Sequence, residues 1–281
     1  MTDKPILVFQ TDFTYKEGAV CAMYGVVKSV DRHLEIIDGS HEIPQYDIWS
    51  ASFRLYQSME FWPTDTIFVS VVDPGVGTAR RACVARTSEG YTIVTPDNGS
   101  LSHVKRKLGI ACVRQIDESV NRLQRTGGSF VFHGRDLFGY CAARLASGVI
   151  TYEEVGPAYG VNEIIELPFC EAVSENGKIS GIFEINDPNF GNLWTNIPLS
   201  MFTDAGIRYG DGVHTRVLHD GKVMLEAVLP FERSFGYAQK AAVMIYNNEL
   251  MHISLAVVQG NLTEQYRLGY GSDWQIEFAK A

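Results

Sequence analysis

Three side chains in the first half of the chain could act together on a small nucleophile. Asp73 directly follows residues 66–72, an apolar and β-branched run that predicts a buried strand. Arg80 comes seven residues later, and His133 stands between the apolar run 130–132 and a predicted helix. Ligands of open α/β sheets bind just outside the carboxyl ends of the strands. A carboxylate, a guanidinium and an imidazole at such an edge could hold and polarise a small nucleophile.

Each of these residues also has a simpler interpretation. Asp73 fits an ordinary Asp-Pro-Gly turn, and Arg80, next to Arg81, fits a solvated surface charge. A single histidine where a strand meets a helix is often structural. Asp12, which follows the first predicted strand, could bind a diol or an amine, or it could cap the next helix. Position alone leaves both roles of Asp12 open.

One segment of the second half combines amide, carboxylate and aromatic side chains. Residues 186–196 read NDPNFGNLWTN, which predicts a loop between strands. A plain turn accounts for the glycine and proline but less readily for Phe190 and Trp194. Planar rings beside amide groups suit a purine, because the rings stack on its face while the amides hydrogen-bond its edge.

The predicted elements change character along the chain. Strands alternate with helices in the first half, which indicates βαβ units around a mostly parallel sheet between helices. Short strands separated by turn signals follow, and they predict an antiparallel barrel or sandwich. We therefore expect an α/β domain over residues 1–165 and an antiparallel β domain over residues 166–281. The predicted strands are 6–10, 34–37, 66–72, 82–86, 91–95, 130–132, 178–185, 212–218, 223–229, 241–246 and 252–258, and the predicted helices include 47–60 and 135–147.

The composition narrows the classes of partner. The net charge of −9 argues against general binding to nucleic acid or to an anionic membrane, because both need a basic face. Five scattered cysteines without a CxxC pair, and histidines without metal-ligand spacing, indicate neither a zinc site nor a disulfide framework. The apolar run 6–9 is too short for a signal peptide, and no segment has membrane-spanning length, so we expect a cytoplasmic protein.

Six motifs, taken in order, resemble one family. They are Thr-Asp-Phe at 11–13, His-Glu-Ile-Pro at 41–44 with Asp47, Val-Val-Asp-Pro-Gly-Val-Gly at 71–77, Thr-Pro-Asp-Asn-Gly at 95–99, Phe-His-Gly-Arg-Asp at 132–136 and Phe-Gly-Asn-Leu-Trp-Thr-Asn at 190–196. Over nearly its whole length the chain is similar to the S-adenosyl-L-methionine (SAM) hydrolases that form adenosine. These proteins are also called SAM hydroxide adenosyltransferases, and they are relatives of the fluorinase and chlorinase.

The resemblance implies both an activity and an architecture. The implied reaction is hydrolysis of SAM to adenosine and L-methionine by attack of water at C5′ of the ribose, with no metal and no organic cofactor. The implied architecture is an α/β N-terminal domain followed by a C-terminal β-barrel. It also implies a homotrimer whose substrate lies between the N-terminal domain of one subunit and the C-terminal domain of its neighbour.

The resemblance assigns roles to particular residues as well. Asp73, Arg80 and His133 fall on the triad that positions and activates water, and either Asp73 or His133 is the group that takes the proton. The other assigned residues contact the substrate: Asp12 binds the ribose hydroxyls, Asp187 the methionine amine and Asn192 the adenine edge, while Phe190, Phe235 and Tyr46 pack against the nucleoside and Val257 lines the adenine through its backbone.

Departures from the halogenases favour water over halide. The halogenases carry Tyr at the position of Asp73, Thr at Val76 and Ser at Gly134, and they insert a long loop where this chain has a tight turn. The fluorinase's Ser-Arg pair for the methionine carboxylate becomes Glu249-Leu250, so we expect Glu249 to meet the ammonium or a ribose group. Two alternatives stay open: a SAM-dependent halogenase, and a non-catalytic protein that binds adenosine or SAM.

Overall fold

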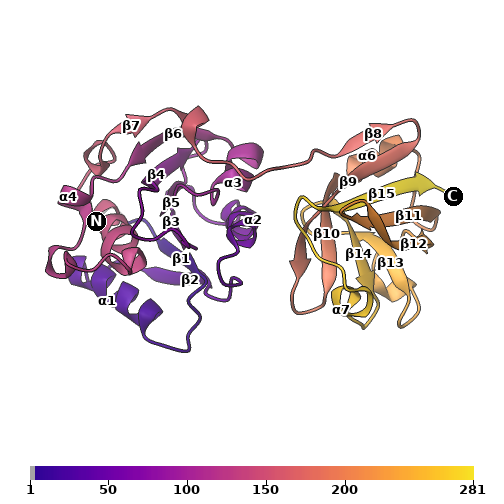
Figure 1. Ribbon diagram of the computed structural model, residues 1–281, viewed down its shortest axis with the longest axis horizontal. Helices are drawn as coiled ribbons and strands as arrows, with labels where there is room; N and C mark the ends of the chain where they lie inside the picture. Colours follow the sequence, from indigo (N-terminus) through magenta and orange to yellow (C-terminus); the bar gives the residue numbers. More distant parts are fainter. Residues whose placement is uncertain (1–3) are drawn as a thin grey trace. The chain divides into compact units, whose positions relative to one another are not determined.

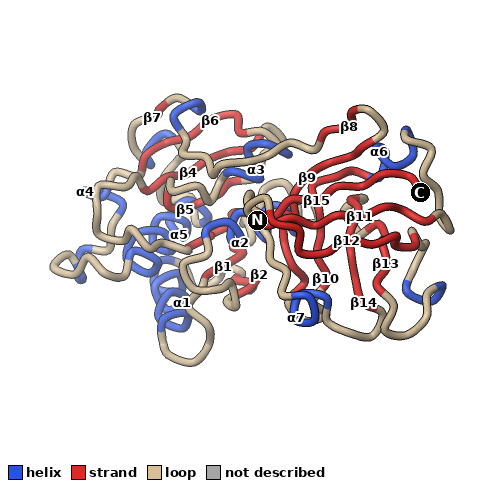
Figure 2. Tube along the Cα trace, turned by 45° about the vertical axis from the view of Figure 1, so that its right-hand side comes forward, coloured by secondary structure: helices blue, strands red, loops and turns tan. Residues whose placement is uncertain are grey.

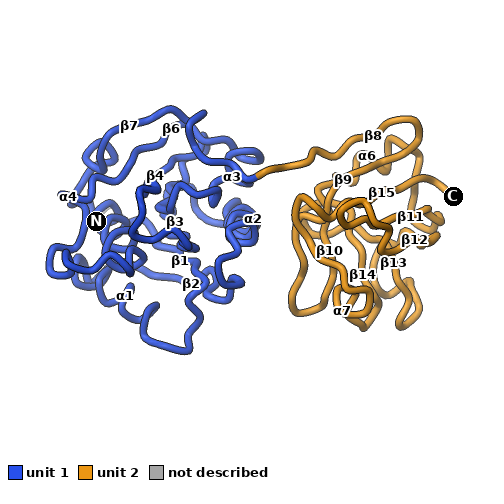
Figure 3. Tube along the Cα trace, viewed as in Figure 1, with its two compact units in different colours: residues 1–167 blue, residues 168–281 orange. Residues whose placement is uncertain are grey.

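The structure is a computed structural model that describes residues 4–281. The chain divides into two compact units, which meet between Leu167 and Pro168 along the sequence (Figures 1 and 3). Helices are concentrated in unit 1, residues up to 167, and strands dominate unit 2, residues 168–281 (Figure 2). Among the described residues, no helix is long and apolar enough to cross a bilayer.

Unit 1 is built on a seven-stranded sheet in the order β2-β1-β3-β5-β4-β6-β7. Strands β2, β1, β3 and β5 are parallel neighbours, whereas β4 and β7 run against them, so the sheet is mostly parallel as predicted. The elements are β1 (Leu7–Thr11), α1 (Ala19–Val30), β2 (Ile36–Ser40), α2 (Ile48–Met59), β3 (Ile67–Val71), β4 (Ala82–Thr87), β5 (Thr92–Pro96), α3 (Ser102–Lys107), β6 (Ile110–Gln115), α4 (Glu118–Asn121), α5 (Tyr140–Ala146) and β7 (Ala158–Tyr159).

Strand β1, which pairs with β2 on one side and β3 on the other, shows how helices cover both faces of this sheet. Successive side chains of a strand point to opposite faces. Phe9 packs in one buried cluster with Met23 of α1 and Cys141 of α5. On the other face, the Gln10 amide donates to the backbone carbonyl of Ala51 in α2, at 2.8 Å. Because both faces are covered, every residue of β1 is buried, and polar groups can be exposed only where the strand ends.

Unit 2 is an antiparallel sheet in the order β12-β11-β15-β9-β10-β14-β13, with β8 paired to β9. A bridge between Phe231, just after β12, and Ile245 of β13 brings the two edge strands together and nearly closes a barrel. Its core is apolar, with Phe183, Phe202 and Phe278 fully buried. The elements are β8 (Val173–Glu175), β9 (Lys178–Asp187), β10 (Asn192–Pro198), α6 (Leu199–Asp204), β11 (Gly212–His219), β12 (Lys222–Pro230), β13 (Val243–Asn247), β14 (His252–Val257), α7 (Leu262–Tyr266) and β15 (Trp274–Lys280).

The predicted fold class is confirmed, but several predicted elements are wrong. Residues 130–132 form no strand, because Phe130 and Val131 project from an exposed loop. The predicted helix 135–147 is confirmed in extent, although it begins as a π-helical segment, Gly134–Gly139, before it continues as α5. The predicted loop 186–196 is mostly strand, since β9 and β10 pair up to Asp187 and Asn192. Strands β6, β7, β8, β10 and β15 were not predicted.

Candidate active site

Two candidate residues meet at one edge of the unit 1 sheet. Strands β1 and β3 are parallel neighbours, so their carboxyl ends lie side by side and the two segments that follow share one edge. Asp12 follows β1 and Asp73 follows β3. Both line a hollow of about 360 Å³, together with Tyr46. The structure therefore brings these three residues to a single surface.

Asp73 is the first member of a chain of three polar side chains. The guanidinium of Arg80 donates hydrogen bonds to the Asp73 carboxylate. Its Nε lies 2.9 and 3.0 Å from the two oxygens, and its Nη2 is in direct contact with Oδ2. The same Nη2 lies 3.0 Å from Nδ1 of His133. Phe138 packs against the guanidinium, with its ring centre 5.2 Å away. Asp73 and Arg80 side chains are largely buried, so the network is held in one geometry.

The contact with Arg80 determines which nitrogen of His133 carries the proton. Arginine nitrogens are donors only, so Nδ1 must accept, and the proton of the neutral ring sits on Nε2. His133 is 3% exposed, and its Nε2 has no hydrogen-bond partner within residues 4–281. Burial, and then the charge of Arg80, lower the pKa of His133. The lowered pKa favours the neutral imidazole at pH 7, with its N–H group at Nε2.

Asp12 does not cap the next helix, which settles one alternative. Helix α1 begins at Ala19, and its N-cap is Gly18. The Asp12 carboxylate instead accepts the backbone N–H of Tyr46 at 2.9 Å. Burial raises the pKa of Asp12, and this hydrogen bond partly offsets the rise. Tyr46, with a φ of 65° and a side chain that is 69% exposed, lines the same hollow as Asp12.

Six further candidates meet in unit 2. A hollow of about 730 Å³ lies in unit 2, and its volume is in the range that accommodates a nucleoside-sized ligand. The rings of Phe190 and Phe235 are substantially exposed there, whereas Asn192 is buried. Exposed rings beside a buried amide offer a stacking surface and a polar edge. The candidates that line this hollow are Asp187, Phe190, Asn192, Phe235, Glu249 and Val257.

The turn between β9 and β10 presents two of these residues. The N–H of Gly191 donates to the carbonyl of Asp187 at 2.7 Å, and its own carbonyl accepts from Thr263 at 3.1 Å. Gly191 has a φ of +67°, and the side chain of Asn261 occupies the place where a Cβ would be. Only glycine fits this position. The tight turn is what puts Phe190 at the rim and Asn192 in the strand.

Among the residues of the unit 2 hollow that the sequence did not single out as site residues are Arg233 and Tyr246. Tyr246 packs against Phe235, with ring centres 5.0 Å apart. Burial raises the pKa of Tyr246 to about 12, and the charges of Asp187 and Glu249 add to the rise. The signal for Arg233 was its place directly before the Ser-Phe-Gly-Tyr motif that contains Phe235.

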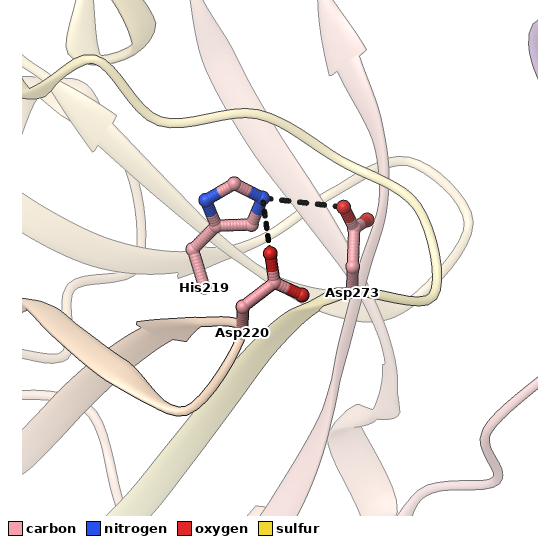
Figure 4. Close-up of side chains that lie close together, drawn as sticks. All are labelled: His219, Asp220 and Asp273. Carbon is pink, nitrogen blue, oxygen red and sulfur yellow. Dashed lines mark hydrogen bonds and ion pairs between the residues drawn. The ribbon is translucent and has the colours of Figure 1, made fainter.

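A separate cluster joins His219, Asp220 and Asp273 at the end of β11 (Figure 4). Its atoms lie within 4.8 Å of one another, so the cluster has the donor set of a possible cation site. Nε2 of His219 lies 3.2 Å from Asp273 and 3.9 Å from Asp220, and its ring stacks on Trp274 at 4.1 Å. All three side chains are partly or largely exposed. A solvated ion pair accounts for this geometry, so we assign the cluster no role.

Comparison with known proteins identifies the family. The model of the SAM hydroxide adenosyltransferase N-terminal domain matches residues 7–156, and that of the C-terminal domain matches residues 183–275. The chain belongs to this family. The predicted resemblance is therefore confirmed over most of the chain.

Individual relatives agree with this assignment. An (R)-S-adenosyl-L-methionine hydrolase of Salinispora arenicola is 36% identical over 233 residues, which cover 78% of this chain and 84% of that protein. A fluorinase of Actinopolyspora mzabensis is 25% identical over 301 residues, covering 97% of each. The crystal structure of an uncharacterized conserved protein from Thermotoga maritima matches with a TM-score of 0.87 and 32% identity, covering 98% of this chain and all of that one.

Proposed function

We propose that this member of the SAM hydroxide adenosyltransferase family hydrolyses SAM to adenosine and L-methionine. The observation that carries the proposal is the Asp73–Arg80–His133 network, which ends at a hollow shared with Asp12. Several relatives bear the name (R)-S-adenosyl-L-methionine hydrolase, which supports this reaction over others of the family. Because that name specifies one sulfonium epimer, both epimers belong in the assay.

The main task of the protein in this reaction is to position water and substrate. The sulfonium is already a good leaving group, so the C5′–S bond breaks with its electrons passing to sulfur as a neutral thioether. A water oxygen bonds to C5′ and loses one proton. Holding water in line with C5′ contributes roughly 7–11 kcal/mol at the upper limit for well-oriented reactants. General-base assistance adds about 10²–10⁴-fold.

Asp73 is the proposed proton acceptor. In neutral His133, Nδ1 already accepts from Arg80 and Nε2 already carries a proton, so neither nitrogen is free to take another. The Asp73 carboxylate, in contrast, lines the hollow directly. Arg80 fixes that carboxylate, and His133 fixes Arg80, so His133 acts as a positioning residue. The proton passes from water to Asp73 and then to solvent.

The remaining candidates fit the two ends of the substrate. The Asp12 carboxylate, anchored by the Tyr46 N–H, is oriented to accept from ribose hydroxyls. In the unit 2 hollow, Asn192 is proposed to bind the adenine edge, and Asp187 the methionine ammonium. The other residues proposed to contact substrate are Tyr46, Phe190, Phe235, Glu249 and Val257. As the resemblance implies, we propose a homotrimer in which the unit 1 hollow of one subunit and the unit 2 hollow of another complete the site.

The direct test is incubation with each SAM epimer, followed by chromatography for adenosine and methionine. Asp73→Ala should lower kcat by about 10²–10⁴-fold with little change in SAM affinity, because its partner is the water. Asp12→Ala should instead weaken SAM and adenosine binding alike, by about ten- to a hundredfold, because both ligands contain the ribose. The proposal would be wrong if SAM stayed intact after incubation with the wild-type protein over a range of pH. Tight SAM binding without turnover would favour a purely binding protein.

A halogenase is the second candidate, because fluorinases are among the relatives. The structure offers little room for the serine that the halogenases carry at Gly134. A Cβ there would lie 3.0 Å from the ring of Phe13 and 3.4 Å from that of Phe132. Formation of a 5′-halo-adenosine that depends on added chloride or fluoride would support this alternative.

A further inference from the structure

The hollow of unit 2 contains an unusual set of charges. Its lining includes two carboxylates, those of Asp187 and Glu249, and a single cationic side chain, that of Arg233. Arg233 is exposed, and within residues 4–281 its guanidinium has no hydrogen bond or ion pair. A guanidinium at a hollow with no partner in the chain is available to a ligand that carries an anion.

The backbone on both sides of Arg233 is anchored. Before it, the N–H of Glu232 donates to the carbonyl of Ile245 in β13 at 2.8 Å. After it, the N–H of Tyr237 donates to the carbonyl of Ser234 at 3.1 Å and closes a short turn that carries Phe235. The backbone of Arg233 is therefore fixed next to Phe235, which is proposed to contact the substrate. The long side chain of Arg233 can still adjust to a ligand.

The charges of the hollow complement those of SAM. The methionine part of SAM carries an ammonium and a sulfonium, which are cations, and one carboxylate. Two protein carboxylates suit the two cations, and one guanidinium suits the carboxylate. A planar guanidinium can bind a carboxylate through two parallel N–H···O bonds, which an ammonium cannot do. The segment where the fluorinase has a Ser-Arg pair is Glu249-Leu250 here, which offers no cation.

We infer that Arg233 binds the carboxylate of the methionine part and so makes the protein selective for SAM over its decarboxylated form. The inference rests on the proposed function, because it takes SAM to be the ligand. Arg233, from a different segment of the barrel, would take the role that the Ser-Arg pair has in the fluorinase. It also leaves Asp187 and Glu249 to the cationic groups of the same substrate.

The experiment compares SAM with decarboxylated SAM, which keeps the adenosine, sulfonium and amine and lacks only the carboxylate. Affinities are measured by calorimetry, and kcat/KM by adenosine release. The wild-type protein should favour SAM by about ten- to a hundredfold, and Arg233→Ala should abolish that preference by weakening SAM alone. Arg233→Lys should retain part of the preference for SAM, because the positive charge stays but the two parallel N–H···O bonds of the guanidinium are lost. Lys240→Ala, which removes an exposed cation outside the hollow, is the matched control.

The outcomes separate this inference from the proposed function. Adenosine release with an unchanged preference in Arg233→Ala would overturn the role of Arg233 and leave hydrolysis intact. Wild-type protein that binds SAM selectively without releasing adenosine would overturn hydrolysis, and the binding ratio would still test Arg233. A wild-type protein that binds the two molecules equally, or neither, overturns the inference. Thermal melting of each variant shows whether a change in affinity reflects loss of the fold.

Discussion

The two ring nitrogens of His133 have different surroundings, and this difference leads to a prediction at the scale of a single residue. Nδ1 faces the Arg80 guanidinium, whereas Nε2 is buried without a partner in the described part of the chain. Protonation of Nδ1 would place two donors against each other. We expect nitrogen-detected NMR to show the Nε2–H tautomer and a pKa below the ordinary value of about 6.5. His133→Gln assigns the signals.

The sign of the pH dependence follows from that lowered pKa. Between it and about 6.5, the unfolded chain binds a proton that the folded chain does not, so the His133 contribution to folding stability is lost as the pH falls. Activity should fall on the acid side for the same reason, because protonated His133 no longer accepts from Arg80. An Nδ1–H tautomer, or a pKa above 6.5, would contradict the proposed geometry.

At the scale of elements, the β9–β10 turn decides how the unit 2 hollow is lined. Gly191 combines a φ of +67° with a Cβ position already filled by Asn261. Gly221, in the β11–β12 turn of the same barrel, has a φ of +76° but no atom within 4 Å of its Cβ position. We expect Gly191→Ala to cost about 1–3 kcal/mol more in urea unfolding than Gly221→Ala, since only the former adds a clash to the backbone strain.

The same pair of variants tests the link between the turn and binding. Gly191→Ala should also weaken adenosine binding, because Asp187, Phe190 and Asn192 depend on the turn. Gly221→Ala lies outside the hollow and should leave binding unchanged. Equal unfolding costs and equal affinities in the two variants would show that the turn does not hold the site.

At the scale of the whole molecule, the division of the candidates between two units gives a test of the proposed trimer. Asp73→Ala disables the unit 1 half of the site, and Asn192→Ala weakens the unit 2 half. If one subunit supplies unit 1 and another supplies unit 2, equal co-expression leaves about a quarter of the sites with two intact halves. Activity at low SAM concentration should then exceed that of either parent trimer.

Two outcomes would contradict the proposed trimer. A site made within one chain would give mixed trimers only the average activity of their two parents, and a monomer by light scattering would rule out the assembly. Co-expression of Asp73→Ala with Asp12→Ala is the matched control. Both changes lie in unit 1, so every unit 1 in the mixture carries a substitution. No mixed trimer can then contain a site with two intact halves.

The sequence by itself determined the class of fold and the family. Apolar runs of strand length, such as 66–72, and the change from alternating helices and strands to short strands alone reflect local burial, which composition records directly. The order of six motifs identified the SAM hydroxide adenosyltransferases before any geometry was known. Local patterns failed where burial was decided elsewhere: residues 130–132 are apolar enough for a strand but find no partner strand.

Only the tertiary structure decided which groups touch. No spacing in the sequence shows that Arg80 bridges Asp73 to His133. Nor does it show which nitrogen of the imidazole accepts the hydrogen bond from Arg80. Nor does it show that Arg233 shares a hollow with Asp187, 46 residues earlier in the chain. The contact of Arg80 with His133, and the hollow that Arg233 shares with Asp187, join segments that are distant in sequence and that the fold of each unit brings together. The residue types were therefore visible in the sequence, whereas their partners, protonation states and roles follow from how the strands pair.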